Sequence, residues 1–120
     1  MKSTLEISEM DEKTRKSETA LYINELLQMN QNEIEKIMRD MIIEMRKATD
    51  ENYVNFCITV FKVISEMDGD KIRDYLNLRV KANMDLPEMI RDRDLKMMEK
   101  ALAAAPDDVI QKISKYMPNF

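Results

Sequence analysis

Glycine is almost absent from this chain, which has one glycine and three prolines in 120 residues. Hairpin-rich sheets need many turn residues of these two types, whereas both disrupt the interior of a helix. Charged residues make up 35% of the chain, enough to supply the solvent-facing sides of long amphipathic helices. A chain of this length is long enough for one domain with its own core. We therefore expect a single all-α domain.

Apolar residues recur at helical spacing along most of the chain, which predicts six helices. They cover about 17–29, 33–48, 53–67 and 71–83, then Pro87 to residue 105, and last the segment from a cap at Asp107 or Asp108 to Met117. The segment 53–67 is apolar on nearly every side and is expected at the centre of the domain. Twelve methionines agree with an adaptable, methionine-rich core and equally with the codon composition of the genome.

Polar residues at the ends of these segments predict where the helices begin and end. Ser17, Asp50 and Asp70 are expected N-caps, and Gly69 is expected in the left-handed conformation that ends the preceding helix. Residues 1–16 carry only isolated apolar residues, so we expect a flexible or loosely docked arm ahead of a helical domain at 17–120.

A step of 38 residues superimposes parts of the apolar pattern. It aligns Ile34 with Ile72 and Ile110, as three stacked α-hairpins of an α-solenoid-like repeat would require. Phe61, however, aligns with Glu99. Both an irregular helical bundle and a stack of α-hairpins therefore agree with the sequence.

Histidine is missing, and Cys57 is the only cysteine. A histidine-dependent triad and a histidine-ligated metal site are excluded, and no intrachain disulfide can form. We expect Cys57 to be an inert packing residue in a reducing cytoplasm. The longest apolar run, 101–105, is too short for a membrane span, and the first residues lack the apolar core of a signal peptide, so no membrane association is expected.

Three charged groups suggest chemistry, and each has a simpler explanation. The run Asp68-Gly69-Asp70 resembles the start of a calcium loop, but Lys71 stands where the sharp turn needs glycine. Four carboxylates of the segment 33–48 could instead hold the magnesium ion of a nucleotide pyrophosphohydrolase. They alternate with basic residues, however, as acids do on a solvent-facing helix surface. These are Glu33, Glu35, Asp40 and Glu44.

Basic residues also gather in the segment 71–83, which could belong to a DNA-reading helix pair. They are Lys71, Arg73, Arg79 and Lys81. The net charge of −4 opposes binding to a phosphate backbone, so nucleic acid is an unlikely partner.

The sequence favours a non-enzymatic helical protein–protein interaction domain, an adaptor or a homo-oligomer whose partner is another protein or itself. A DNA-binding transcriptional regulator and the pyrophosphohydrolase are the alternatives. We assign no catalytic, cofactor-binding or metal-ligating residue. Four apolar residues near ends and turns are expected to stay exposed, namely Met10, Leu86, Met89 and Phe120.

Overall fold

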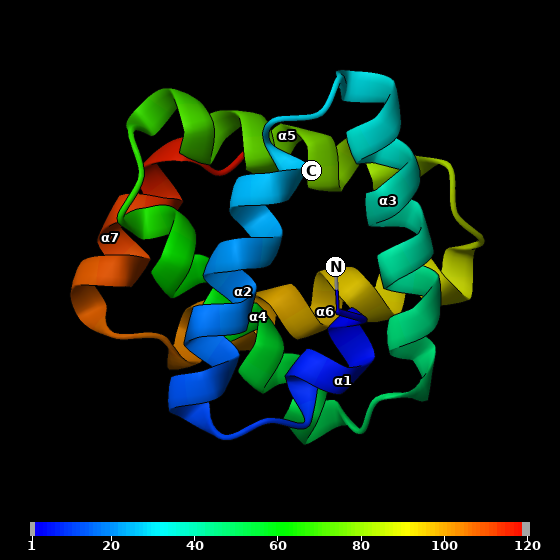
Figure 1. The fold of residues 1–120 in the computed structure, drawn as a ribbon, viewed down its shortest axis with the longest axis horizontal. Helices are drawn as coiled ribbons and strands as arrows, with labels where there is room; N and C mark the ends of the chain where they lie inside the picture. The colour runs from blue at the N-terminus through cyan, green and yellow to red at the C-terminus, as the bar shows by residue number, and fades with distance from the viewer. Residues whose placement is uncertain (1, 119–120) are drawn as a thin grey trace.

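Seven α-helices and one short 3-10 helix build the computed structural model, which describes residues 2–118 (Figure 1). The helices are α1 (Thr4–Ser8), α2 (Glu12–Leu26), α3 (Gln31–Glu44), η1 (Met45–Lys47), α4 (Asp50–Ser65), α5 (Gly69–Met84), α6 (Glu88–Ala104) and α7 (Asp107–Tyr116). Residues 2–118 contain no strand. The all-α prediction is confirmed, and each of the six predicted helices is present.

The starts of α2, α3 and α4 lie earlier than predicted because other residues cap them. The side chain of Asp11, not Ser17, accepts a hydrogen bond from the Thr14 backbone N–H at 2.9 Å. Thr49 rather than Asp50 caps α4, with its hydroxyl accepting from the Asn52 N–H at 3.1 Å. Each true cap is an oxygen-bearing side chain in extended backbone, as helix N-termini require.

The N-terminal segment differs from the loosely docked arm that its composition suggested. Residues 4–8 form α1, and α2 already begins at Glu12. Ile7 is only 1% exposed and packs in the same core as the rest of the chain. Leu5 and Met10 also pack against the core, and Ser3 and the Leu5 N–H bond to the Glu44 carboxylate. Apolar spacing over so few residues could not reveal this docking.

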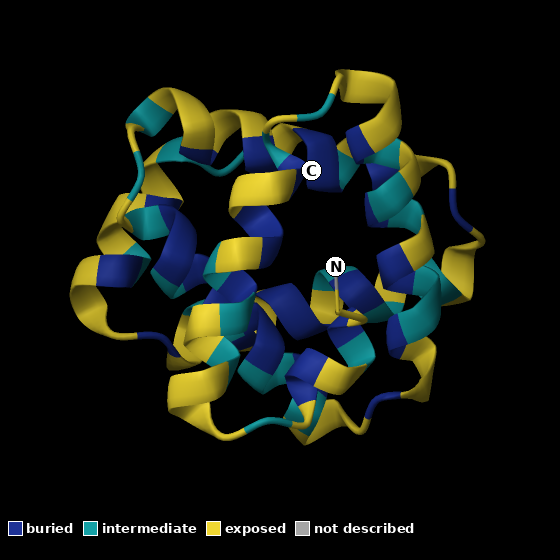
Figure 2. Ribbon diagram, viewed as in Figure 1, coloured by how far each residue is buried: buried dark blue, intermediate teal, exposed yellow. Residues whose placement is uncertain are grey.

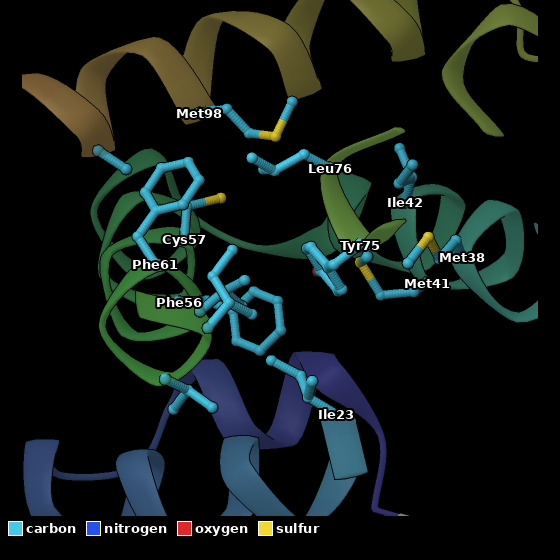
Figure 3. Close-up of a cluster of buried hydrophobic side chains, with 14 of the residues drawn as sticks. Ile23, Met38, Met41, Ile42, Phe56, Cys57, Phe61, Tyr75, Leu76 and Met98 are labelled. Carbon is cyan, nitrogen blue, oxygen red and sulfur yellow. The ribbon is translucent and has the colours of Figure 1, made fainter. Parts of the chain in front are cut away.

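Helix α4 lies at the centre, as its apolar composition predicted. It packs against α1, α2, α5, α6 and α7, while α3 packs mainly on α5. Buried residues face inward on every surrounding helix (Figure 2). In the core, Phe56 and Phe61 of α4 face Tyr75 and Leu76 of α5, with Met98 of α6 above them (Figure 3).

The molecule is a compact globule of 32 × 29 × 25 Å with a Cα radius of gyration of 12.9 Å. A globular domain of this length has a radius of gyration of roughly 13–14 Å, so the helices form a closed bundle. The 38-residue repeat itself stays a prediction. None of the helices within residues 2–118 is both long and apolar enough to cross a bilayer.

Gly69 plays a different role from the predicted left-handed helix end. It is the first residue of α5, and no glycine in the described part of the chain has a positive φ. A Cβ atom at this position would overlap the ring of Tyr116 at the end of α7. The absence of a side chain at Gly69 therefore allows the close approach of Tyr116, whose ring would have to shift if a Cβ were present.

Replacing Phe61 tests the central position of α4. Phe61 is 1% exposed, so Phe61→Ala should lower the free energy of unfolding by roughly 3–5 kcal/mol, through lost burial and the cavity left behind. Ile58→Ala, on the same helix but only half-buried, is the matched control and should cost clearly less. Urea denaturation measures both, and equal losses would contradict the central placement.

Candidate functional site

An ion pair between Arg79 of α5 and Asp94 of α6 lies inside the core. Both side chains are shut off from solvent, at 1% and 0% exposure. The Arg79 guanidinium donates two hydrogen bonds to the Asp94 carboxylate, from Nε to Oδ2 at 3.0 Å and from Nη2 to Oδ1 at 2.7 Å. This bidentate geometry is the strongest arrangement that the two groups can form.

Four neighbours complete the buried polar cluster. Asp94 also accepts hydrogen bonds from the Tyr53 hydroxyl and, at 2.8 Å, from the side-chain amide of Asn83. Arg79 donates to the Tyr75 hydroxyl at 3.0 Å, and its Nη2 lies 3.9 Å from the Cys57 sulfur. The cluster therefore ties α4, α5 and α6 together.

Mutual attraction keeps both members of the ion pair charged. Burial alone would raise the pKa of Asp94, but the positive charge of Arg79 and the hydrogen bonds to the carboxylate outweigh it, and the pKa is lowered. Burial alone would lower the pKa of Arg79, and the charge of Asp94 reverses that shift. Burial also raises the pKa of the Cys57 thiol to about 12, so this residue is a neutral thiol at neutral pH.

Each of the four basic residues behind the DNA-binding alternative can now be placed. Arg79 is buried in the ion pair, Lys81 pairs with Glu35 at 3.0 Å, and Arg73 pairs with Asp70 at 3.3 Å. Lys71 is exposed. The segment therefore does not present a continuous basic face.

The acidic residues considered for metal binding are spread over separate contacts. The Glu33 carboxylate accepts from the side-chain amide of Asn30, Glu35 pairs with Lys81, and Glu44 accepts from Ser3 and the Leu5 N–H. Asp40 is exposed on α3. Asp68 precedes α5 at its N-cap. Within residues 2–118, no three acidic or cysteine side chains are grouped in a way that could hold a metal ion.

The α5–α6 corner exposes apolar surface. Met84 and Met89, on either side of the turn, are 70% and 87% exposed. Beside Met89 lies a groove of about 190 Å³, walled by α3, η1, α4 and α6. Its lining residues are Ile42, Arg46, Tyr53, Met89, Ile90 and Arg93.

Arg93 fixes one wall of this groove. Its guanidinium donates to the carbonyls of Met45, Arg46 and Ala48 and to the Asp50 carboxylate at 2.7 to 3.2 Å. It also lies over the Tyr53 ring, 5.0 Å from the centroid. Arg93 of α6 thus satisfies carbonyl groups at the end of η1 and in the following turn, and these bonds keep the walls of the groove in place.

Of the four apolar residues expected to be exposed, Met89 is confirmed. Leu86 is wrong, because it is 8% exposed and packs in the core. Met10 is half-buried against the core, and Phe120 lies outside the described residues.

Comparison of the chain with family models, with curated proteins and with solved structures gives no match. The geometry of these side chains is therefore the basis for any functional proposal.

The sequence did not predict the buried cluster, although it contains a signal for it. Arg79 follows Ile72, Tyr75 and Leu76 at helical spacing, so it occupies a core position. Asp94 stands in the same way ahead of Met97, Met98 and Ala101. A charged residue within each of two apolar stripes predicts a buried pair. The alternating charges of Arg91-Asp92-Arg93-Asp94 are typical of a solvent-facing surface, and they obscure this signal.

Breaking the ion pair from one side should be more harmful than removing it. Arg79→Met and Asp94→Leu should each lower the free energy of unfolding by about 3–5 kcal/mol, because each leaves an uncompensated buried charge. The double variant should lose clearly less than the sum of the two. Urea denaturation at pH 7 gives the three values, and additive losses would show that the two side chains do not act as a pair.

The same pair should make the wild-type fold sensitive to acid. Because the folded pKa of Asp94 is lowered, its contribution is present above the unfolded pKa of about 3.9 and is lost as pH falls through the folded value. The free energy of unfolding, measured from pH 6 to 2, should thus fall more steeply in the wild type than in the double variant. Exposed acids such as Asp11 and Asp50 are common to both proteins and cancel in the comparison.

Cys57 should react slowly with a thiol reagent in the folded protein and rapidly in denaturant, because its thiol is buried and neutral. Leu21→Cys in a Cys57→Ala background is the matched control, since Leu21 is 58% exposed and the new thiol should react at once. Stopped-flow absorbance follows both reactions. Immediate stoichiometric reaction of the folded wild type would contradict the burial of Cys57.

Proposed function

We propose that this chain is a non-enzymatic helical protein–protein interaction domain, acting as an adaptor or as a homo-oligomer. One observation carries the proposal: Met84 and Met89 are exposed on either side of the α5–α6 turn, and Met89 adjoins an apolar groove. Exposed apolar surface next to a groove with a polar rim is typical of a protein-binding site. Methionine suits such a surface because its unbranched side chain adapts to the shape of a partner.

Two sets of interactions hold α5 and α6 in place at this corner, which favours binding of a partner without a change in the backbone. The buried ion pair holds α5 against α6 from inside, and Arg93 bonds α6 to η1 and the start of α4 from outside. A preformed surface loses less conformational entropy on binding, so more of the contact energy remains as affinity. The single cysteine, a buried free thiol, fits the proposed cytoplasmic location.

The DNA-binding alternative has less support than a protein partner. DNA binding needs basic residues gathered on one face, whereas Arg79 is buried and Lys81 and Arg73 are paired with acids. The pyrophosphohydrolase would need carboxylates that converge on a metal, whereas the carboxylates of Glu33, Glu35 and Glu44 make separate contacts.

Charged substitutions at the corner test the proposal. The immobilised wild type should retain specific proteins from a lysate of its native host, while Met84→Glu/Met89→Glu should lose them because a carboxylate cannot enter an apolar interface without cost. Leu21→Glu, which changes an exposed apolar residue on α2, should bind like the wild type. Mass spectrometry of the retained proteins measures the difference.

Identical retention by all three proteins would contradict the assignment of this corner. Sub-micromolar binding of duplex DNA that weakens steeply with salt would favour the regulator instead.

A further inference from the structure

We propose that the partner at the α5–α6 corner is a second copy of this chain, bound about a two-fold axis with Met89 of each copy in the groove of the other. This inference rests on the proposed function and names the partner. It is carried by three features of one surface: an exposed apolar side chain, an apolar groove beside it, and two unpaired opposite charges at its rim.

The first two features fit each other. Met89 is the most exposed large apolar side chain in the described part of the chain, at 87%. The groove of about 190 Å³ has Ile42, Ile90 and the Tyr53 ring in its walls, so an apolar side chain can be buried there. A two-fold interface brings the same patch of both copies together, so a protruding residue meets the groove next to its counterpart.

Several exposed charges near the corner have no ion-pair partner, and two opposite ones adjoin Met89 and its groove. Arg93 pairs with Asp50, Arg39 with Asp85, and Arg91 with Asp92. Within residues 2–118, neither Arg46 nor Glu88 takes part in an ion pair, although Arg46 donates its Nε to the Ile43 carbonyl. Arg46 lines the groove opposite α6, and Glu88 directly precedes Met89.

Inserting Met89 into the partner's groove therefore carries Glu88 toward the Arg46 on that rim. The symmetry forms this pair twice, once on each side of the axis. A surface that carries both charges beside its own apolar centre can be complementary to itself. A purely acidic or a purely basic partner would leave one of the two charges unpaired.

Charge reversal gives a sharp test, because these two residues are exposed and outside the buried cluster. Sedimentation velocity should show a concentration-dependent dimer of the full chain. Arg46→Glu and Glu88→Arg should each weaken dimerisation more than about tenfold, since each places like charges opposite one another twice. Circular dichroism checks that both variants keep their helices.

An equimolar mixture of the two variants should dimerise again. In the mixed dimer, the two acids of one copy face the two bases of the other, so both pairs are attractive. Met89→Ala should weaken all of these dimers, and Lys47→Glu, a neighbouring exposed charge, should leave the wild-type affinity unchanged. Added salt should weaken the wild-type dimer.

A wild-type chain that stays monomeric at all concentrations would overturn the proposal, as would a mixture that pairs no better than either variant alone. If the monomer still retains other proteins through Met84 and Met89, the proposed function stands and only the second copy is excluded. If that retention is also absent, both proposals fail.

Discussion

The buried ion pair of Arg79 with Asp94 is the interaction on which the arrangement of the helices depends. Moving two charges out of water costs several kcal/mol for each, and this cost is offset only where geometry and hydrogen bonding are good. Here the carboxylate receives bonds from Arg79, Asn83 and Tyr53, which come from two different helices. Any shift of α4, α5 and α6 relative to one another would break some of these bonds. The pair therefore selects one packing among those that apolar contacts alone would allow.

The buried ion pair and its neighbours also fix the position of the exposed α5–α6 corner. Asn83 and Asp94 are buried in the core and bonded to each other. Met84, the residue after Asn83, is exposed. Arg93, the neighbour of Asp94, points to the outside and bonds to η1 and the start of α4. Two adjacent residues of α6 thus hold the helix from opposite sides. The hydrogen bonds of the buried cluster hold α5 and α6 in a fixed relative position, so the exposed apolar residues at their corner are also held in place.

The apolar core around the ion pair is rich in flexible side chains. Buried methionines come from α3, η1 and α6. They are Met38, Met41, Met45, Met97 and Met98. Methionine fills irregular space well but specifies a unique packing poorly. A directional polar cluster at the centre supplies the specificity that such a core lacks, which is a physical reason for the two features to occur together.

The sequence by itself determined the all-α class, six of the helices and the central place of α4, because scarce glycine and a 3.6-residue period act locally along the chain. It predicted exposed apolar residues near ends and turns, which is correct for Met89 and wrong for Leu86. Only the tertiary structure decided that α1 docks through Ile7, that Gly69 makes room for Tyr116, and that Arg79 and Asp94 meet in the core. Each of these contacts joins different helices, and amphipathic spacing fixes which face of a helix is buried without fixing what that face meets. The exposed corner and its groove were decided in the same way, by packing that brings η1 beside α6.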